Sequence, residues 1–375
     1  MSRDFSNVKR IVIKVGTNLL SSQTKIDENR IRVIVNQIAE LKRCGYQVVL
    51  VSSGAIGMGA KELNIKHSVK DIAMRQALAS IGQPVLMSTY RKYFSDKDII
   101  CSQVLITRKD LDNRKTYVNL RNSVFSLLDL GIVPILNEND SISTAEIGSA
   151  FGDNDRMSAL VASKIDAQLL VILTDIDGLY NDNPNKNPNA KLISEIETID
   201  DEIMSFAKGA GSIFSTGGMK TKLLAAKIAS IAGCKCIIAS GKDNDALNKI
   251  LACDEFGTLI NSKERKSQRS RWIINSSING KIVVDNGAKE ALENKKSLLP
   301  SGIIEIKGAF EAGDVIEIQD NKGLAFAKAV PYYDSTDILS IIGHNSSDIE
   351  DLLGPGKKTV IFRPEDIVFI NARNE

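Results

Sequence analysis

The sequence predicts an α/β protein, a three-layer αβα sandwich around a mainly parallel sheet, followed by a small β-barrel-like domain. Apolar runs of strand length alternate with helical stripes over the first two-thirds of the chain, and the strands are almost continuously apolar. After the basic stretch that ends at Trp272, short strands separated by turn residues take over. With 375 residues, the chain exceeds one ordinary domain. We expect a first domain over residues 1–260, a basic linker over 261–276 and a second, small domain over 277–375.

The overall composition excludes several classes of protein. Hydrophobic residues make up 43% of the chain, and the formal net charge of +2 provides no global field toward nucleic acid or membrane. The apolar run Ile11–Ile13 is too short for a signal or membrane-spanning segment. Five scattered cysteines indicate reduced thiols and a cytoplasmic protein, and Cys234 and Cys236 lack the second pair that a structural zinc site needs.

The first predicted strand, residues 8–15, contains a lysine near its end. Lys14 is costly in an apolar strand unless it points into a site, and Gly16 lets a ligand approach the backbone. The alternative is an edge strand with a solvated lysine. Asp27 then caps a helix, which Gly45 ends. Further helices are predicted over 71–94, 117–130, 155–166 and 220–232, and further strands over 48–51, 99–106, 132–136, 169–173 and 236–240.

Small or polar clusters follow the predicted strands. They are Lys14–Asn18, Ser52–Gly54, Asn137–Asp140 and Thr174–Asp175, with Gly152–Asp155 before the fourth. A single such cluster is commonly a turn or a helix cap. Because the carboxyl ends of parallel strands meet at one edge of a sheet, several clusters together predict a common ligand site.

The stretch 211–227, GSIFSTGGMKTKLLAAK, joins a glycine loop to a helix. The junction at Thr216, Gly217 and Gly218 offers backbone N–H groups and the positive end of a helix dipole, which suit a phosphate. Lys220 and Lys222 add positive charge there. The spacing does not match a Walker A loop. The alternative is an ordinary loop before an exposed helix.

The clusters contain lysines, carboxylates and amides, whereas both histidines, His67 and His344, lie outside them. This set suits phosphoryl transfer, in which a protein mainly positions groups and neutralises charge. Lys14 and Lys222 are expected to flank the transferred group. A carboxylate acceptor, with a pKa of roughly 4, needs no general base, which favours an acyl-phosphate product. A base role for Asp155 stays open.

Taken together, the motifs KVGTNLL, VSSGAIGMG, NENDS, FGDNDRMSALVA, ILTDIDGLY and STGGMKTKLLAA resemble the glutamate 5-kinase family of the amino acid kinase superfamily. The resemblance implies ATP-dependent phosphorylation of the γ-carboxylate of L-glutamate, the first step of proline synthesis. It also implies Mg²⁺ held mainly by the ATP phosphates, proline as a feedback inhibitor and a homo-oligomer.

The resemblance assigns roles to individual residues. It assigns none of them as a metal ligand. It implies catalytic roles for Lys14, Asp155 and Lys222. The implied glutamate-binding residues are Ser53, Gly54, Ala55, Asn137, Asp140 and Asn154. The implied nucleotide-binding residues are Lys14, Gly16, Thr174, Asp175, Thr216, Gly217, Gly218, Met219, Lys220, Thr221 and Lys222. The chemistry agrees, because Asp140 can hold an ammonium group while Ser53 and following N–H groups hold a carboxylate. The segment Glu146–Phe151 looks slightly longer than the family pattern.

The last third contains the motifs GKIVVDNGAKEAL, SLLPSGI and FEAGDVIEI, which resemble the PUA domain. Strands are predicted over 281–284, 303–306, 315–318, 324–330 and 359–362. RNA binding is one hypothesis for this domain. A structural or regulatory role is favoured, because the domain has no arginine-rich stripe with interleaved aromatic residues.

Two other functions remain as alternatives. One is another amino acid kinase, acting on N-acetylglutamate, aspartate, carbamate or a nucleoside monophosphate; the PUA-like domain together with the NEND and GDND clusters argues against it. The other is an RNA-binding protein with an inactive kinase-like domain, which the presence of Lys14, Asp155 and Lys222 argues against.

Overall fold

The computed structural model describes residues 3–22, 25–65, 67, 69, 71–142, 154–184, 186–207, 218–263 and 267–370. The chain divides into two units, Met1–Arg265 and Lys266–Glu375. Each unit contains its own sheet and its own buried apolar core. No helix among the described residues is long and apolar enough to cross a membrane.

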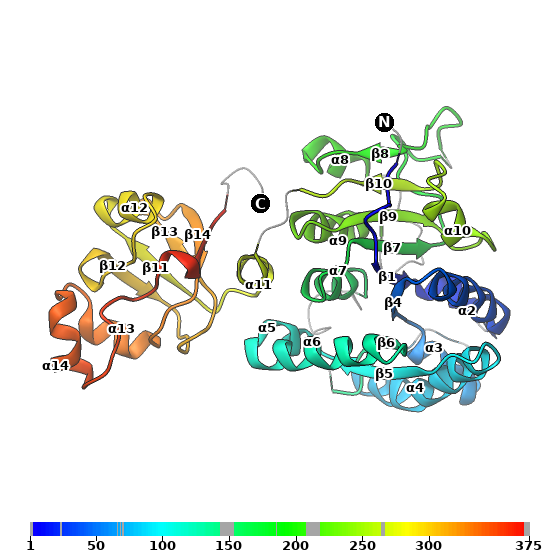
Figure 1. Ribbon diagram of the computed structural model, residues 1–375, viewed down its shortest axis with the longest axis horizontal. Helices are drawn as coiled ribbons and strands as arrows, with labels where there is room; N and C mark the ends of the chain where they lie inside the picture. The colour runs from blue at the N-terminus through cyan, green and yellow to red at the C-terminus, as the bar shows by residue number, and fades with distance from the viewer. Residues whose placement is uncertain are drawn as a thin grey trace. The chain divides into compact units, whose positions relative to one another are not determined.

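The first unit is built on an eight-stranded sheet with the order β5-β6-β4-β1-β7-β9-β10-β8, which can be followed from bottom to top in Figure 1. The strands are β1 (Arg10–Val15), β4 (Gln47–Val51), β5 (Cys101–Ile106), β6 (Val133–Glu138), β7 (Leu169–Thr174), β8 (Glu195–Ile196), β9 (Lys235–Ser240) and β10 (Thr258–Ile260). All neighbours in this sheet are parallel except β9 and β10. Strands β2 (Ser21–Ser22) and β3 (Lys25–Ile26) form a separate pair.

Helices cover both faces of this sheet (Figure 1). One face carries α6 (Arg114–Asp129), α7 (Asn154–Lys164) and α9 (Met219–Ile231); the other carries α2 (Glu28–Arg43), α4 (Ile72–Ser95) and α10 (Ala246–Leu251). Alternate residues of β1 point into the two cores, with Val12 in one and Ile11 and Ile13 in the other. The predicted three-layer sandwich is confirmed. Shorter helices are α1 (Thr17–Leu20), α3 (Ala55–Glu62), α5 (Arg108–Asp112) and α8 (Asp201–Phe206).

Local sequence signals explain several helix boundaries. The predicted cap at Asp27 is present, because its side chain accepts a hydrogen bond of 2.9 Å from the Arg30 backbone N–H. Asp71 caps α4 in the same way through the N–H of Met74, at 2.8 Å. Helix α4 continues from Ile72 to Ser95 with Pro84 inside it. It begins and ends within a residue of the predicted range.

Two glycines allow α3 to pack directly onto α4. A Cβ atom on Gly82 would lie 1.9 Å from the Ala55 carbonyl oxygen, and one on Gly59 would lie 2.0 Å from the Leu78 carbonyl oxygen. Neither position has room for a larger residue without moving backbone. This close contact holds α4 beneath the turn at Ser52–Gly54, where the predicted substrate residues begin.

The second unit contains a five-stranded sheet with the order β12-β11-β13-β14-β15. Its strands are β11 (Gly280–Val284), β12 (Ile303–Lys307), β13 (Ile316–Gln319), β14 (Ala325–Ala329) and β15 (Ile367–Phe369). Its helices are α11 (Gln268–Asn275), α12 (Asn286–Glu293), α13 (Ser335–Ile341) and α14 (Ile349–Leu353), with 3₁₀ turns at Pro300–Gly302, Ser346–Asp348 and Pro364–Asp366. The strands β11 and β13 pair in parallel and the other neighbours pair antiparallel.

Two predictions in this part of the chain need correction. The strand predicted over 359–362 is wrong, because only Phe362 pairs there, as an isolated bridge to Leu298. The segment predicted as a linker contains α11, with Trp272 buried. This helix contacts β15, and Arg269 forms an ion pair with the buried Asp366. Helix α11 is therefore an integral part of the second unit.

Candidate active site

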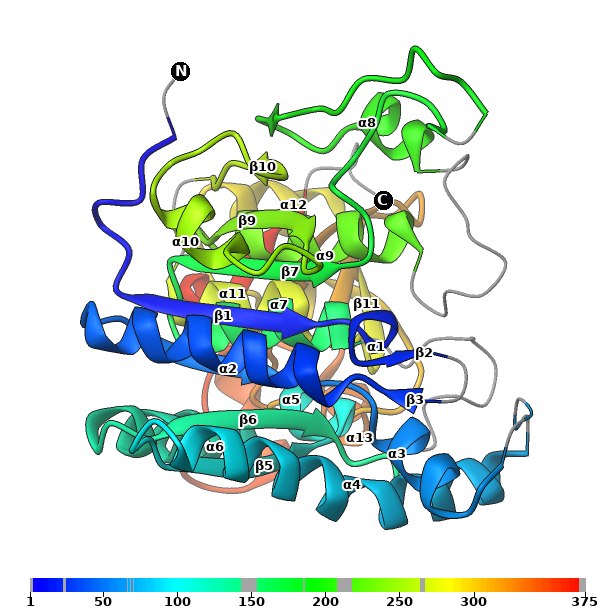
Figure 2. The same ribbon diagram turned by 90° about the vertical axis from the view of Figure 1, so that its right-hand side faces the viewer.

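The carboxyl ends of the central strands meet at one edge of the first unit's sheet. In Figure 2, β1 and β7 point to the same side, and α1 lies just beyond the end of β1. The parallel register pairs Lys14 with Val51 on β4 and with Ile172 on β7. Lys14 thus stands near the centre of this edge.

A buried lysine–aspartate–lysine cluster lies at this edge. Asp155 comes from the first turn of α7, and its Oδ1 is 2.6 Å from Lys14 Nζ, while its Oδ2 is 3.3 Å from Lys222 Nζ. The exposed fractions of Lys14, Asp155 and Lys222 are 6%, 3% and 5%. The structure therefore brings the three predicted catalytic residues together, with the carboxylate between the two ammonium groups.

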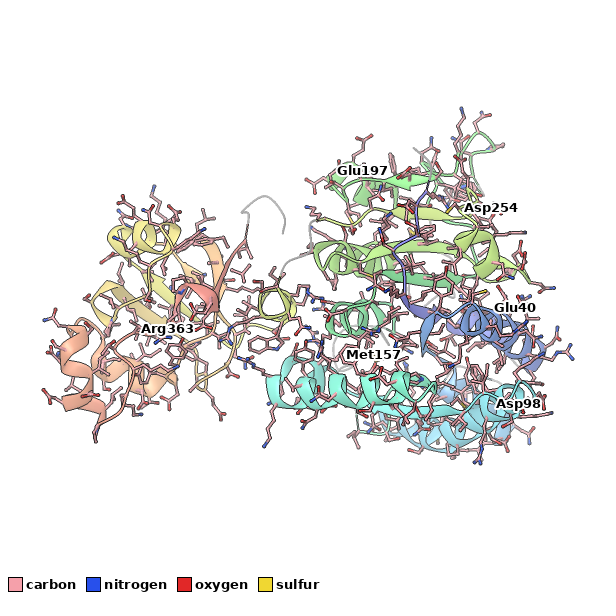
Figure 3. All side chains as sticks on the ribbon, in the orientation of Figure 1. Glu40, Asp98, Met157, Glu197, Asp254 and Arg363 are labelled. Atoms are coloured by element: carbon pink, nitrogen blue, oxygen red, sulfur yellow. The ribbon has the colours of Figure 1, made fainter. Side chains whose placement is uncertain are left out.

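Helix α7 is a rigid support for this carboxylate. Every residue of the helix except Arg156 is buried. Met157, labelled in Figure 3, lies in the core between the sheet and the helices on this face. Such close packing leaves the helix little freedom to shift, so the position of Asp155 is set by the core.

Within the cluster, the pKa values of Asp155 and Lys222 both lie below their ordinary values. Burial by itself would raise the pKa of Asp155, but the nearby charges and hydrogen bonds of Lys14 and Lys222 outweigh it and hold the pKa below the ordinary value. Burial lowers the pKa of the Lys222 ammonium, and the Asp155 carboxylate opposes this effect. The Asp155 carboxylate is thus ionised at neutral pH and stabilises the charged form of Lys222.

The start of α9 adds a hydroxyl to the cluster. Thr221 Oγ1 lies 3.1 Å from Asp155 Oδ2 and donates to the Gly218 carbonyl oxygen at 2.8 Å. Gly218 is the N-cap of α9, and among the described residues no side-chain hydrogen bond caps the helix. Lys220 is exposed, whereas the Met219 side chain is buried in the core. The predicted nucleotide residues Thr216 and Gly217 lie outside the described residues.

Side-chain amides form a second cluster beside the first. Asn154 Nδ2 donates to the Ser52 carbonyl oxygen at 2.9 Å, to Ser53 Oγ at 2.7 Å and to Asn137 Oδ1 at 3.1 Å. Asn137 Nδ2 in turn donates to Gln83 Oε1 at 2.8 Å. The predicted glutamate-binding residues Ser53, Asn137 and Asn154 are therefore joined in one hydrogen-bonded network next to Asp155.

The predicted nucleotide residues at the ends of β1 and β7 also lie together. Gly16 N–H donates to the Leu173 carbonyl oxygen at 3.1 Å. Thr174 Oγ1 donates to Asp175 Oδ1 at 3.1 Å, and Asn18 Nδ2 reaches Asp175 Oδ2 at 3.3 Å. A Cβ atom on Gly16 would stand 3.6 Å from Lys14 Nζ. Glycine at this position keeps the approach to the lysine open.

Three remaining predicted substrate residues surround this edge. Gly54 has a φ of 105°, in the left-handed region that favours glycine, and it is the N-cap of α3. Ala55 begins that helix and is buried. Asp140 follows β6 and is half-buried. The segment Glu146–Phe151, which was expected to be longer than the family pattern, and Gly152 and Asp153 lie outside the described residues.

Two polar residues of α4 were not predicted as part of the site. Gln83, 8% exposed, contacts Asn137, and the buried hydroxyl of Tyr90 lies 2.9 Å from Ser52 Oγ. The sequence offered one signal for Gln83: a polar residue on the apolar side of a helix, between Gly82 and Pro84. The hydroxyl contact of Tyr90 left no signal, since tyrosine is common in cores.

The chain is similar to known proteins along nearly its whole length. Residues 9–240 match the amino acid kinase family and residues 280–353 match the PUA domain. The chain is 43% identical over 371 residues to a glutamate 5-kinase of Methanosarcina barkeri, covering 96% of this chain and 97% of the relative. It is 40% identical over 375 residues to a glutamate 5-kinase of Carboxydothermus hydrogenoformans, covering 99% and 100%. Among solved structures, carbamate kinase from Giardia lamblia bound to AMP-PNP matches 69% of this chain and 100% of its own, at 19% identity and a TM-score of 0.49.

Proposed function

Because this chain belongs to the amino acid kinase family, and within it to the glutamate 5-kinases, we propose that the Lys14–Asp155–Lys222 cluster carries its phosphoryl transfer. The enzyme phosphorylates the γ-carboxylate of L-glutamate, the first step of proline biosynthesis. The observation that carries the proposed site is the pair of buried ammonium groups held within 3.3 Å of one carboxylate. Two ammonium groups and one carboxylate leave a net charge of one positive unit facing the reacting phosphate.

The reaction needs charge stabilisation more than proton transfer. A γ-carboxylate oxygen of glutamate attacks the γ-phosphorus of ATP, the bond from that phosphorus to the bridging oxygen breaks, and ADP leaves with the electron pair. The acceptor is already ionised at neutral pH, so no proton has to be removed. Lys14 and Lys222 stabilise the negative charge on the transferred group from two sides.

Asp155 acts in this proposal by positioning the two lysines. Both of its oxygens face an ammonium group, and its pKa is held below the ordinary range. A carboxylate of this kind is a weak base and has no oxygen directed away from a cation. The base role that the sequence left open is therefore not part of the proposed mechanism.

ATP is placed at the nucleotide side of the edge. Gly16, Thr174 and Asp175 lie at the ends of β1 and β7, and the N-terminus of α9, whose N-cap Gly218 has no side chain, offers backbone N–H groups to phosphate oxygens. Mg²⁺ is held mainly by the ATP phosphates. Asp155 does not serve as its ligand in this proposal, because the lysines occupy both oxygens. The ion would neutralise phosphate charge.

Glutamate is placed at the amide cluster. Asp140 pairs with the α-ammonium group, while Ser53 and the N–H groups that follow it hold the α-carboxylate. Proline shares both of these groups with glutamate, so it is proposed to compete for the same place.

The C-terminal PUA unit is assigned a structural or regulatory role, in preference to RNA binding. The enzyme is also proposed to form a homo-oligomer. Ile100 and Leu130, at one end of the edge strand β5 and of α6, are 69% and 74% exposed, which supports an interface there. Sedimentation at several protein concentrations tests the assembly, and a monomer at every concentration would refute it.

A substrate screen with ATP and hydroxylamine tests the assigned reaction, because hydroxylamine traps acyl phosphates as hydroxamates. Glutamate, N-acetylglutamate, aspartate and carbamate are compared at equal concentration. Hydroxamate from glutamate alone is expected, and a preference for another acceptor would overturn the assignment.

A further inference from the structure

The amide cluster has a fixed orientation that follows from its backbone contacts. The Glu138 backbone N–H, which can only donate, lies 2.9 Å from one amide atom of Asn137, so that atom is the oxygen Oδ1. The Ser52 carbonyl, which can only accept, lies 2.9 Å from one amide atom of Asn154, so that atom is the nitrogen Nδ2. The contact of 3.1 Å between these two assigned atoms is consistent, because it joins a donor to an acceptor.

This orientation leaves one acceptor of the cluster unused. Asn154 is 9% exposed, and its Oδ1 is buried with no hydrogen-bond partner within the described part of the chain. A buried acceptor without a partner is destabilising, because it has given up its hydrogen bonds to water. The Asn154 nitrogen is held by Ser52, Ser53 and Asn137, so the oxygen must point away from them. A substrate ammonium group is the donor that the proposed glutamate site supplies.

Gln83 determines whether Asn137 can keep this arrangement. With Asn137 Oδ1 engaged by Glu138 N–H and Asn154, the Asn137 amide nitrogen still needs an acceptor, and Gln83 Oε1 provides it at 2.8 Å. Gln83 Nε2 then faces Gln103 Oε1 at 3.2 Å. The packing of α3 on α4 at Gly82 fixes the helix that carries Gln83.

We propose that Gln83 is a positioning residue for amino acid recognition: by holding the Asn137 amide, it keeps the Asn154 carbonyl oxygen turned toward the ammonium group of the substrate. Gln83 itself touches neither substrate nor the reacting atoms. The proposal rests on the proposed glutamate site, with Asp140 taking one N–H of the ammonium and Asn154 another. It makes α4, which carries none of the predicted site residues, a determinant of substrate specificity.

The test compares glutamate with glutarate, which has the same two carboxylates and no ammonium group. Initial rates give KM for glutamate and ATP, and glutarate is measured as a competitive inhibitor. Gln83→Leu removes the acceptor, and it should raise the KM for glutamate roughly tenfold, the loss expected for one hydrogen bond of about 1.4 kcal/mol. The inhibition constant of glutarate and the KM for ATP should stay within about twofold, since neither ligand uses the Asn154 oxygen.

Two further variants separate positioning from packing. Gln83→Glu keeps an oxygen facing Asn137, and the Gln103 amide can turn its nitrogen toward the new carboxylate, so the KM for glutamate should remain near the wild-type value. Gln37→Leu is the matched control: Gln37 is another buried helical glutamine, which accepts from the Leu247 N–H at 2.8 Å, outside the site. This control should lower the melting temperature and leave both glutamate and glutarate binding unchanged.

The possible outcomes are distinct. If Gln83→Leu weakened glutamate and glutarate equally, or weakened neither, the positioning role would be overturned. Gln83→Met provides the same comparison should the leucine variant not fold. The wild-type rate with glutamate tests the proposed function separately, because an enzyme that fails to phosphorylate glutamate would fail before any variant is made.

Discussion

Lys14 Nζ on β1 lies 2.6 Å from Asp155 Oδ1 on α7, and both side chains are almost completely buried. This ion pair joins the centre of the sheet to the helix that covers it. A buried charge is costly without a partner, and here one carboxylate serves two lysines. The charge of the site therefore depends on the protonation of Asp155 and Lys222.

The pH dependence of kcat should report the protonation of the Lys222 side chain. Its ammonium form is present below its folded pKa and is lost as the pH rises through that value. Because burial lowers this pKa from the ordinary 10.5, kcat should begin to fall on the alkaline side below pH 10.5. Asp155→Asn removes a charge that raises the pKa, so it should move the decline to lower pH.

Profiles of log kcat against pH for the wild type, Asp155→Asn and Lys222→Arg measure this. The arginine variant should move the decline to higher pH, because a guanidinium stays protonated beyond pH 12. Identical alkaline limbs in all three proteins would show that another group controls the profile.

Asp140 should contribute to glutamate binding and not to ATP binding. Asp140→Asn removes the charge that pairs with the ammonium group. It should raise the KM for glutamate and the inhibition constant of proline together, with the KM for ATP unchanged. Initial rates in millimolar proline at sub-saturating glutamate provide both values. Proline that does not inhibit the wild type, or an equal rise in the KM for ATP, would contradict the shared site.

Much of the first unit could be predicted, because apolar runs of strand length alternate regularly with helical apolar stripes. Apolar runs such as 169–173 predicted the strands of the sheet. Polar residues directly after these runs predicted the edge of the sheet at which a ligand binds. The resemblance added the roles of Asp155 and Lys222. The contact of Asp155 with both lysines was not predicted, because it depends on how α7 and α9 pack against β1.

The elements that were missed or wrongly predicted have physical explanations. Short strands carry little periodicity, so β8 and β10 were missed and a strand over 359–362 was predicted where only Phe362 forms a bridge. The basic composition of residues 263–271 suggested a linker and hid the apolar positions Trp272 and Ile273 of α11, which are buried. Gln83 was missed because its role follows from a hydrogen bond between elements.

The first unit alone should keep its activity. The residues proposed for catalysis precede β9, and the Lys263 backbone N–H still bonds to the Ser230 carbonyl oxygen of α9 at 3.0 Å. We therefore propose that a fragment ending at Lys263, at the boundary expected near residue 260, folds and phosphorylates glutamate. Circular dichroism establishes folding, and the hydroxamate assay measures turnover. A folded but inactive fragment would show that the PUA unit helps to build the site.

The turnover of Lys14→Ala and Lys222→Ala tests the central claim most directly. Each variant removes one cation beside the transferred phosphoryl group, a contribution of roughly 3 kcal/mol in the transition state, so kcat should fall about a hundredfold or more. Lys164→Ala is the matched control, because Lys164 is another buried lysine, located at the far end of α7 and 4.3 Å from the centre of the Tyr117 ring. In the hydroxamate assay with saturating ATP and glutamate, the control should keep wild-type turnover while both site variants lose it. Near-normal turnover in Lys14→Ala or Lys222→Ala would contradict the account.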